Sequence, residues 1–288
     1  MTAPKDEPAG RAATEREARE REARALATDA DHALAAELAA RSAALLRELR
    51  EAGRDDDPDE LRKQGDRRSH ELLVSELAAR RPADAVLSEE GRDDPRRLAA
   101  RRVWIVDPLD GTREFGEPGR PDWAVHVALV IDGLPVVGAV ALPARNEVWS
   151  TAVVTSAAAN RGPAPDPPRL AVSRTRPGWS AGLVERALGA ELVPLGSAGY
   201  KALAVVRGEA DIYAHSGGQC EWDSAAPVAV ALAHGLHASR LDGTKLAYNN
   251  PDPYLPDLLI AHPDCARAAL RAVSGGDPTA GISPARET

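Results

Sequence analysis

Cysteine is nearly missing from this sequence. Its 288 residues include only Cys220 and Cys265, and no C-x-x-C pair occurs. Two isolated cysteines exclude a disulfide framework and a cysteine-ligated zinc site. We therefore expect a reduced, cytoplasmic protein.

Aromatic residues and long apolar runs are also scarce. Aromatic side chains make up 3% of the chain, so we expect a core built mainly from Ala, Val and Leu. No apolar run reaches the length of a membrane span, and residues 1–27 are charged rather than hydrophobic. We therefore expect no membrane partner and no signal peptide.

Acidic residues outnumber basic residues in this sequence. The formal net charge is −8, whereas proteins that bind nucleic-acid polymers are usually basic. A nucleic-acid polymer is therefore not expected as a partner, but a small anionic substrate is compatible, because bound divalent cations reverse the local field. With 43% hydrophobic and 28% charged residues, the chain has the composition of one large globular domain or two joined halves.

Several catalytic motifs are absent as well. The sequence has no G-x-S-x-G elbow, no Walker A loop and no G-x-G-x-x-G fingerprint, which disfavours the enzyme classes that depend on them. An aspartyl-phosphate nucleophile is also disfavoured. Enzymes of that class have one residue between their two aspartates, whereas Pro108 and Leu109 separate Asp107 from Asp110.

A short apolar run followed by a dense polar segment is the most informative feature that is present. Val103–Val106 predicts a buried strand, and Asp107-Pro-Leu-Asp-Gly-Thr112 follows at once. We expect the strand to end there, because Pro108 lacks an N–H and fixes φ. Gly111 and Thr112 then offer backbone N–H groups to a phosphate at the start of a helical turn.

Carboxylates elsewhere complete a candidate metal site. Glu89 follows a short strand over 85–87, and Asp223 opens a helix. Oxygen ligands without nearby His or Cys select Mg²⁺ or Mn²⁺ over zinc. Two such ions roughly 4 Å apart clamp the attacking and leaving oxygens of phosphoryl transfer. The predicted metal ligands are Glu89, Asp107, the Leu109 carbonyl, Asp110 and Asp223.

Two arrangements are candidates for activating water. In one, Glu89 acts on a metal-activated water; in the other, the Thr112 hydroxyl lies between the water and the Asp66 carboxylate. Asp66 stands where we expect a helix to begin, so a capping role explains it almost equally well. His126 lies inside a strand-like run, where a buried core or edge histidine is favoured over a metal ligand.

Residues 15–156 predict a first half with helices followed by a sheet. A helix over 15–52 carries leucines on one face, and a second helix is expected over 61–79. The leucines are Leu34, Leu38, Leu45 and Leu49. Strands over 123–131, 135–142 and 147–154 predict an antiparallel meander.

Residues 169–273 predict a second half in which strands and helices alternate. Strands are expected over 170–173 and 210–214, a loop at 217–218, and helices over 180–188, 200–207 and 228–234. The segment 157–168 is a predicted linker, 1–14 is a predicted disordered tail and 274–288 is a predicted flexible tail. These elements predict a layered α/β sandwich with an antiparallel sheet and two helices in the first half, a mixed sheet in the second, and the active site between them.

Three segments together resemble the signatures of the inositol monophosphatase superfamily of Mg²⁺-dependent, lithium-sensitive phosphatases. They are Ser88-Glu-Glu90, Trp104-Ile-Val-Asp-Pro-Leu-Asp-Gly-Thr112 and Trp222-Asp-Ser-Ala-Ala226. Their order and separation also match, over roughly residues 34–272. The resemblance implies the sugar-phosphatase fold, two or three Mg²⁺ ions with Mn²⁺ as an alternative, and a homodimer.

Within that superfamily, Asp110-Gly-Thr-Arg-Glu-Phe115 is similar to the CysQ-type 3′(2′),5′-bisphosphate nucleotidase branch. Pro118-Gly-Arg-Pro-Asp-Trp-Ala-Val-His126 and Ser239-Arg-Leu-Asp-Gly-Thr244 resemble the actinobacterial form of that branch. The implied reaction cleaves 3′-phosphoadenosine 5′-phosphate (PAP) to AMP and phosphate, in connection with sulfate assimilation. Inositol 1-phosphate and fructose 1,6-bisphosphate are alternative substrates for the same chemistry. A non-catalytic phosphate- or nucleotide-binding regulator is the alternative of another class.

The resemblance also implies roles for individual residues. Asp66 and Thr112 match the pair that orients the nucleophilic water, while Gly111 and Thr112 hold the scissile phosphate. Ser197 and Lys201 lie near the substrate, with Lys201 as a partner for a second phosphate, and Asp223 contacts the substrate as well as metal. Cys220 either lines the pocket or is an inert surface thiol.

Overall fold

The structure, a computed structural model, describes residues 7–53, 57–154 and 162–275. The first half contains α1 (Glu7–Leu26), α2 (Asp29–Ala52), α3 (Pro58–Arg80), β1 (Ala85–Ser88), η1 (Pro95–Ala99), β2 (Arg102–Asp110), α4 (Thr112–Gly116), β3 (Ala124–Ile131), β4 (Leu134–Leu142), η2 (Pro143–Arg145) and β5 (Glu147–Ser150). The second half contains β6 (Arg169–Ser173), α6 (Trp179–Leu188), β7 (Glu191–Leu195), α7 (Ala198–Val206), β8 (Ile212–Cys220), α8 (Glu221–Ala233), β9 (His237–Ser239), β10 (Tyr254–Ala261) and α9 (Pro263–Ser274).

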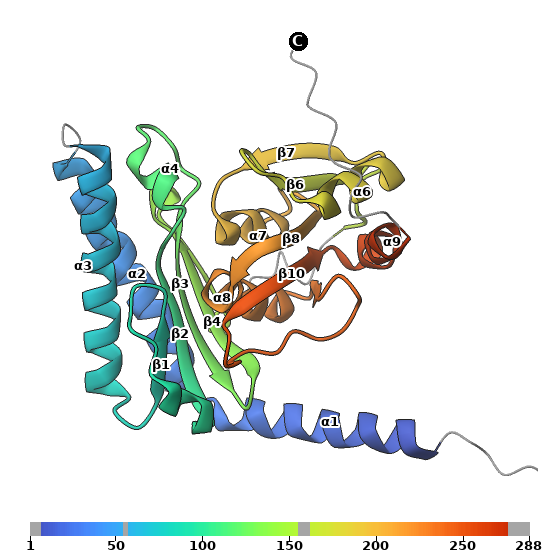
Figure 1. The fold of residues 1–288 in the computed structure, drawn as a ribbon, viewed down its shortest axis with the longest axis horizontal. Helices are drawn as coiled ribbons and strands as arrows, with labels where there is room; N and C mark the ends of the chain where they lie inside the picture. Colours follow the sequence, from blue (N-terminus) through green and yellow to red (C-terminus); the bar gives the residue numbers. More distant parts are fainter. Residues whose placement is uncertain (1–6, 54–56, 155–161, 276–288) are drawn as a thin grey trace, which may run out of the picture.

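Two sheets alternate with three layers of helices (Figure 1). The first sheet has the order β1-β2-β3-β4-β5 and the second has the order β7-β6-β8-β10-β9. Helices α2 and α3 cover one face of the first sheet, α7 and α8 lie between the two sheets, and α6 and α9 cover the outer face of the second. The layered α/β sandwich predicted from the sequence is confirmed.

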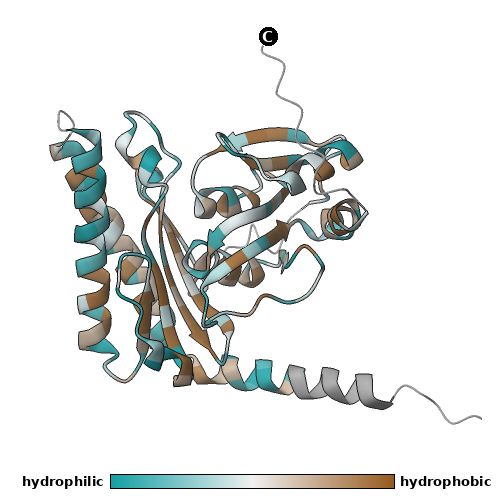
Figure 2. Ribbon diagram, viewed as in Figure 1, coloured by the Kyte–Doolittle hydropathy of each residue, from teal (hydrophilic) through white to brown (hydrophobic). Residues whose placement is uncertain are grey.

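Alternating residues of the buried strands supply two adjacent cores. In β2, Trp104 and Val106 face the core beneath α2 and α3, whereas Val103 and Ile105 face the core shared with α7 and α8. Apolar residues run almost unbroken along these strands (Figure 2). Because both faces of the first sheet are covered, β3 is buried along its whole length. Ala, Val and Leu fill most of both cores, as the low aromatic content predicts.

The prediction of one continuous helix over 15–52 is wrong. Thr28 separates α1 from α2: its side chain accepts from the Asp31 N–H, and the Asp31 carboxylate accepts from the Thr28 N–H. This capping box starts a new helix because it satisfies N–H groups that have no partner in the helix. On the inner face of α2, Leu46 is fully buried and Leu45 is only half-buried.

The prediction that β2 ends before Pro108 is also wrong. Strand β2 runs on to Asp110, and its pairing with β3 shifts register between Asp107 and Asp110. The shift is an irregularity of the kind that accommodates a residue without an N–H. Ser69 of α3 donates to the Pro108 carbonyl at 2.7 Å, which satisfies a buried acceptor in the distorted segment.

The predicted capping role of Asp66 is a further error. Helix α3 begins at Pro58, and the Asp57 side chain accepts from the N–H groups of Asp59 and Glu60. Asp66 therefore lies well inside the helix. It sits one residue after Gly65, where a Cβ would lie 2.9 Å from the Leu109 side chain, so α3 packs tightly against the end of β2.

The sheets differ from prediction at their edges. Strands β3, β4 and β5 form the expected antiparallel meander, but β1 pairs with β2 in parallel, so the first sheet is mixed. In the second half, β8 continues through Gly217 and Gly218 to Cys220, where we expected a loop. Strands β9 and β10 and helix α9 have no counterpart in the sequence prediction.

The predicted tails and linker fall largely outside the described residues. This holds for residues 1–6, 155–161 and 276–288, while α1 begins at Glu7 inside the predicted first tail. Among the described residues, none of the helices combines the length and apolar character needed to cross a membrane.

Replacing Gly138 with alanine is expected to lower the free energy of unfolding by about 1–3 kcal/mol, the usual effect of adding volume to a packed core. Gly138 lies in β4 under α8, and a Cβ there would lie 2.7 Å from the Ala226 carbonyl oxygen and 2.7 Å from the Ala229 Cβ. Urea denaturation measures the change. Gly162→Ala is the matched control, because its Cβ would meet no atom within 4 Å. Equal stability of the two variants contradicts the close packing of α8 on β4.

Candidate active site

Strand β2 brings two aspartates to one end of the first sheet. The Leu109 N–H donates to Asp107 Oδ1 at 3.0 Å, which holds the distorted end of the strand together. Gly111 follows with a φ of 86°, in the left-handed region that favours glycine. A Cβ at this residue would also lie 3.0 Å from the Ser197 Cβ. The turn after Asp110 therefore requires glycine for both backbone and packing reasons.

Helix α8 supplies a third aspartate. Asp223 lies in the first turn of α8 and accepts from the Cys220 N–H at 2.6 Å, which fixes its carboxylate at the helix N-terminus. Carboxylate oxygens of Asp107, Asp110 and Asp223 lie within 4.8 Å of one another. We call these three residues the aspartate cluster. It joins one end of the first sheet to a helix of the second half.

Glu89 stands beside the aspartate cluster. Because β1 pairs in parallel with β2, with Ser88 opposite Val106, the residue after Ser88 lies next to Asp107. The two carboxyl groups are close enough for the charge of Glu89 to raise the pKa of Asp107. Desolvation of the carboxyl group, together with the charge of Asp110, raises the pKa of Glu89 to about 7, although the residue is exposed on the surface.

Two members of the aspartate cluster hold protons more readily than ordinary aspartates. Burial, followed by the charges of Glu89, Asp110 and Asp223, raises the pKa of Asp107 well above its usual range. Burial and the charge of Asp110 raise the pKa of Asp223 to about 7. The cause is crowding of like charges away from water, which favours protonation unless a cation compensates them.

Asp110 is the exception, because protein donors already surround it. The Ser197 hydroxyl donates to Oδ2, and the N–H groups of Ala198 and Gly199 donate at 3.1 and 2.6 Å. Burial favours the neutral carboxyl, but the hydrogen bond and charge of His126 outweigh it and lower the pKa of Asp110 to about 2. Asp110 thus anchors the N-terminus of α7 as well as belonging to the aspartate cluster.

His126 is a site residue whose contacts sequence reasoning missed. It is buried, as predicted, with Nε2 at 3.2 Å from Asp110 Oδ2 and Nδ1 at 3.0 Å from the Trp222 carbonyl oxygen. A Cβ on Gly199 would lie 1.9 Å from Nε2, so α7 approaches the ring closely only because it has glycine there. His126 thereby connects β3 to α7 and α8. The one signal in the sequence was its position inside an apolar, strand-like run.

The donor set fits a hard divalent cation. Glu89, Asp107 and Asp223 offer carboxylate oxygens whose raised pKa values reflect uncompensated negative charge, and such ligands suit Mg²⁺, Mn²⁺ or Ca²⁺. The Leu109 carbonyl is nearby and accepts from the Thr112 hydroxyl at 3.0 Å. The carboxylate of Asp110 has fewer lone pairs available for a metal ion, because both of its oxygens already accept hydrogen bonds.

The predicted pair of Asp66 and Thr112 is brought together. Thr112 Oγ1 lies 3.4 Å from Asp66 Oδ1, at the point where α3 packs against the start of α4. Burial, with a further contribution from the charge of Glu90, raises the pKa of Asp66 to about 7. A carboxyl group of this pKa exchanges a proton readily near neutral pH.

A cavity of about 250 Å³ opens beside Thr112. It lies between α4 of the first half and the segments that follow β6 and β7 in the second half. Ser197 lines it, and so do four cationic residues: Arg113, Arg174, Arg176 and Lys201. Lys201 is buried at its inner end, where its ammonium group donates to the carbonyls of Gly196 and Ser197. Of the five residues predicted to bind substrate, Gly111, Thr112, Ser197 and Lys201 line this cavity, whereas Asp223 is not among its lining residues.

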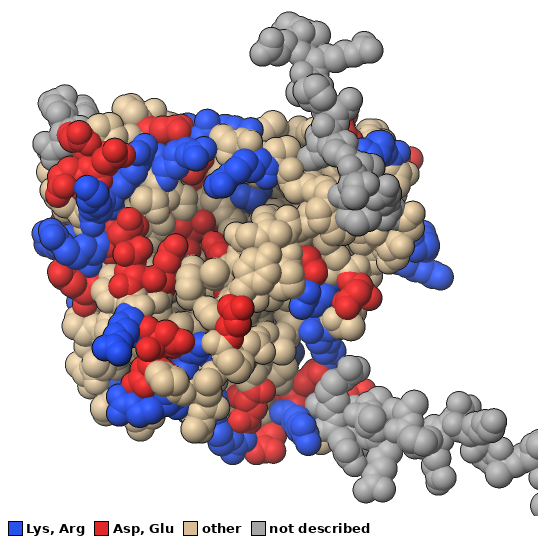
Figure 3. All heavy atoms as spheres, viewed as in Figure 1, with Lys and Arg blue, Asp and Glu red and all other residues tan. Residues whose placement is uncertain are grey.

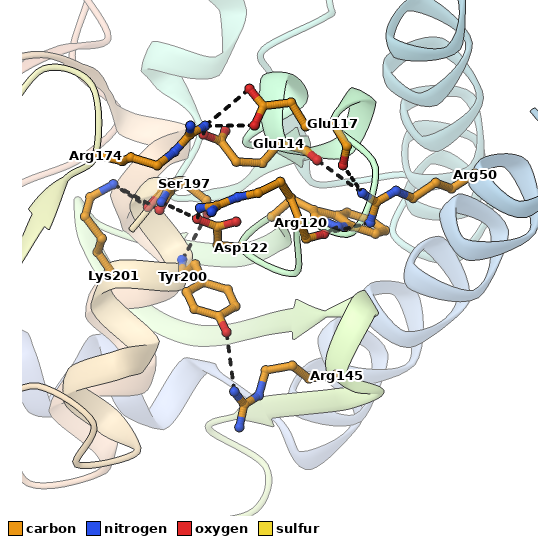
Figure 4. Close-up of polar contacts among 12 residues, drawn as sticks. Arg50, Glu114, Glu117, Arg120, Asp122, Arg145, Arg174, Ser197, Tyr200 and Lys201 are labelled. Carbon is orange, nitrogen blue, oxygen red and sulfur yellow. Dashed lines mark hydrogen bonds and ion pairs between the residues drawn. The ribbon is translucent and has the colours of Figure 1, made fainter. Parts of the chain in front are cut away.

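Ion pairs between the halves border this cavity (Figure 4). Arg174 of the second half lies 2.9 Å from Glu114 Oε1 and 3.1 Å from Glu117 Oε2 of the first. Arg50 of α2 reaches the same loop from the other side, donating to the carbonyls of Glu117 and Arg120. The loop after Thr112 is thus fixed by one arginine from each half.

Cys220 is the N-terminal capping residue of α8 and is half-buried. Burial, together with the charge of Asp223, raises the pKa of its thiol to about 11. The thiol is therefore protonated at neutral pH and is a poor nucleophile. Cys265 is buried in the outer core of the second half, and neither cysteine forms a disulfide.

Charge is segregated around the site. Acidic side chains gather on the face between the halves, and basic side chains border them along the upper edge of the view (Figure 3). The arrangement matches a site that takes a cation on one side and an anion on the other. It is consistent with the metal and phosphate positions predicted from the sequence.

Comparison with known proteins agrees with this geometry. The model of the inositol monophosphatase family matches residues 19–273. A Mycobacterium leprae protein named 3′-phosphoadenosine 5′-phosphate phosphatase is 52% identical over 253 residues, covering 84% of this chain and 93% of that protein. A protein of the same name from Mycobacterium tuberculosis is 54% identical over 225 residues, covering 76% and 84%.

Solved structures support the same relationship. CysQ from Bacteroides thetaiotaomicron superposes with a TM-score of 0.67 at 25% identity, covering 82% of this chain and 98% of that one. Inositol monophosphatase II from Staphylococcus aureus superposes with a TM-score of 0.69 at 19% identity, covering 84% and 92%, and shares the fold. The chain belongs to the inositol monophosphatase family.

Proposed function

We propose that this protein is a Mg²⁺-dependent phosphatase that hydrolyses the 3′-phosphate of PAP to give AMP and phosphate. The observation that carries the proposal is that the cation-lined cavity is bordered by Thr112 and by Ser197, whose hydroxyl donates to Asp110 of the aspartate cluster. This arrangement suits a substrate with two phosphates, one at the metal ligands and one among the arginines. Relatives at 52–54% identity that are named as PAP phosphatases support the same substrate.

The chain's own residues supply binding and proton transfer. Glu89, Asp107, Asp110, Asp223 and the Leu109 carbonyl would hold the metal, and Asp110 also anchors the N-terminus of α7. A divalent cation bound there neutralises phosphate charge and acidifies the attacking water. The N–H groups of Gly111 and Thr112 face the scissile phosphate at the start of α4.

We assign the activation of water to the pair of Thr112 and Asp66. The hydroxyl lies 3.4 Å from Asp66 Oδ1 and 3.0 Å from the Leu109 carbonyl oxygen, and its one proton can be donated to either of them. With the proton turned to the Asp66 carboxylate, the hydroxyl oxygen can accept from the water on its other side. The pKa of about 7 suits Asp66 to receive a proton near neutral pH. Glu89 is the alternative base, because its pKa is also about 7 and it borders the same cluster.

We assign the second phosphate to the outer part of the cavity. Arg113 and Arg176 are exposed there and make no ion pair with any described residue, whereas Arg174 is shared with Glu114 and Glu117. Guanidinium groups bind phosphate through charge and paired N–H donors. Lys201 contributes positive charge from inside, although burial lowers its pKa.

The wider setting of the reaction is proposed on the same basis. PAP as substrate connects the protein to sulfate assimilation, as the resemblance implies. Two free cysteines fit a reduced cytoplasmic location. The homodimer expected from the resemblance is retained as a proposal.

Asp107→Asn is expected to lower kcat for PAP more than about a hundredfold. Mutating a residue that only hydrogen-bonds a metal ligand commonly lowers activity by about 10- to 100-fold, and loss of a ligand itself should have a larger effect. The variant should fold, because it removes one of several repelling charges. Phosphate release measures the loss. Asp132→Asn, at a surface hairpin where Asp132 pairs with Arg101, is the isosteric control and should keep full activity. If the parent protein releases no phosphate, the proposal of an enzyme is contradicted, and the alternative of a non-catalytic phosphate- or nucleotide-binding regulator is favoured.

Stability without metal is expected to fall as the pH rises from about 4 to 7. Glu89, Asp66 and Asp223 have pKa values of about 7 in the folded protein, against ordinary values of 4.5 for Glu and 3.8 for Asp. Between these values the native state binds more protons than the unfolded state, so increasing pH favours unfolding.

Mg²⁺ compensates these charges and should therefore raise the melting temperature more at about pH 8 than at about pH 5. Thermal unfolding with and without Mg²⁺ measures both effects. A Mg²⁺ shift that is the same at both pH values contradicts the assignment of the cation to these carboxylates.

Arg176→Met is expected to lower kcat/KM for PAP roughly tenfold, because it removes a hydrogen bond between the arginine and a charged phosphate, and such a bond contributes a free energy of this size. Activity on adenosine 3′-phosphate, which lacks the second phosphate, should be unchanged. Arg186→Met changes an exposed arginine of α6 and should leave both substrates unaffected. Equal losses on both substrates contradict the second-phosphate site. Preference of the parent for inositol 1-phosphate or fructose 1,6-bisphosphate contradicts PAP as the substrate.

A further inference from the structure

Arg97 is a buried arginine that connects the two halves. It lies in η1, a few residues after Glu89, and its side chain is 1% exposed. Its Nε and Nη2 donate to the Asp93 carboxylate at 2.6 and 3.0 Å. Its Nη1 donates to Asn249 Oδ1 at 2.8 Å and to the Asn250 carbonyl at 2.9 Å. One guanidinium group thus holds both the segment after Glu89 and a loop of the second half.

The same loop is bound to the start of α8. Glu221 is the first residue of α8 and is fully buried. Its carboxylate accepts from the N–H groups of Asn249 and Asn250 at 2.6 and 2.8 Å, and from Asn250 Nδ2 at 2.8 Å. Asn249 has a φ of 62° and returns a hydrogen bond from Nδ2 to the Arg97 carbonyl at 3.0 Å. Asn249 and Asn250 are therefore held by Arg97 of the first half and by Glu221 of the second.

These contacts form one continuous path between two predicted metal ligands. It runs from the Glu89 segment through Asp93 and Arg97 to Asn249, and from there through Glu221 to Asp223, two residues along α8. We call Arg97, Asn249 and Glu221 the inter-half brace. Buried charges are stable only when their partners are complete, so each member holds the others in one geometry.

We propose that the inter-half brace sets the separation of Glu89 from Asp223 and thereby the affinity of the site for its metal. Its members are positioning residues, because none of them belongs to the aspartate cluster. The inference rests on the proposed metal ligands, and it is independent of which phosphate ester is hydrolysed. It assigns a role to three residues that the proposed reaction does not use.

The inter-half brace can control this separation because Glu89 and Asp223 lie on different elements. Glu89 lies after the end of β1, and the link from its N–H to the Val106 carbonyl is long, at 3.4 Å. Asp223 lies in the first turn of a helix from the other half. The sheet alone does not fix their separation, whereas the inter-half brace contacts the segments of both. Arginine is required, because a lysine ammonium cannot span Asp93 and Asn249 together.

Asn249→Gly is the sharpest test. Glycine keeps the left-handed backbone and the N–H that Glu221 accepts, and it removes only the amide contacts with Arg97. Asn146→Gly is the matched control: Asn146 also has a positive φ, of 54°, and its side chain accepts from Arg47 at 2.9 Å. Asn146 lies outside the proposed metal and substrate sites. Arg97→Lys is a second test, which keeps the charge.

Metal binding is measured without substrate, by electron paramagnetic resonance of free Mn²⁺ during titration of the full-length protein. Asn249→Gly and Arg97→Lys are expected to weaken Mn²⁺ binding about tenfold, as loss of partners beyond the ligands commonly does. The Mg²⁺ concentration for half-maximal phosphate release should rise by the same factor, with kcat at saturating Mg²⁺ nearly unchanged.

Unchanged Mn²⁺ affinity in Asn249→Gly overturns the proposal, whatever its melting temperature. An equal loss in Asn146→Gly also overturns it, because the effect is then general destabilisation. Weaker Mn²⁺ binding in Asn249→Gly alone supports the inter-half brace even if the parent does not hydrolyse PAP. Failure of the proposed substrate is thus distinguishable from failure of this inference.

Discussion

The repulsion among buried carboxylates at the end of β2 is the constraint on which the rest of the site depends. Asp107 is almost completely buried, and Glu89 and Asp223 face it with pKa values of about 7. Such a group of charges persists in a folded protein only with protons, cations or fixed donors. The neighbouring structure reflects this need, because α7 directs two N–H groups and a hydroxyl at Asp110.

Local sequence patterns predicted the parts of this site that lie close together in the chain. A strand, two aspartates and a glycine in the segment Val103–Thr112 were sufficient to indicate a metal and phosphate turn. The layered sandwich was also predictable, because covered strands are apolar throughout and helices are amphipathic. Short elements at sheet edges, such as β9, carry too weak a pattern to be recognised.

Contacts between distant segments could not be predicted. Nothing near His126 indicates that its ring meets Asp110 and the Trp222 carbonyl, and nothing near Arg97 indicates Asn249. The error at Pro108 has the same origin, because packing of α3 against β2 overrode a strand-breaking residue. The error at Asp66 has a local origin, because the helix already begins at Pro58 with Asp57 as its cap. Local preference is a weak guide where a carbonyl such as that of Pro108 finds a partner on another element.

Helix α8 is encoded in the second half but packs rigidly against the first. Its Ala226 carbonyl meets the backbone of β4 where only Gly138 leaves room, and its first turn carries Asp223. Helix α8 therefore belongs to the second half by its position in the sequence, but by its packing it also belongs to the first. A fragment ending after β5 would lack α8 and would leave one face of the first sheet uncovered. We therefore expect a chain divided between β5 and β6 to give two pieces, with Asp223 separated from Asp107 and Asp110.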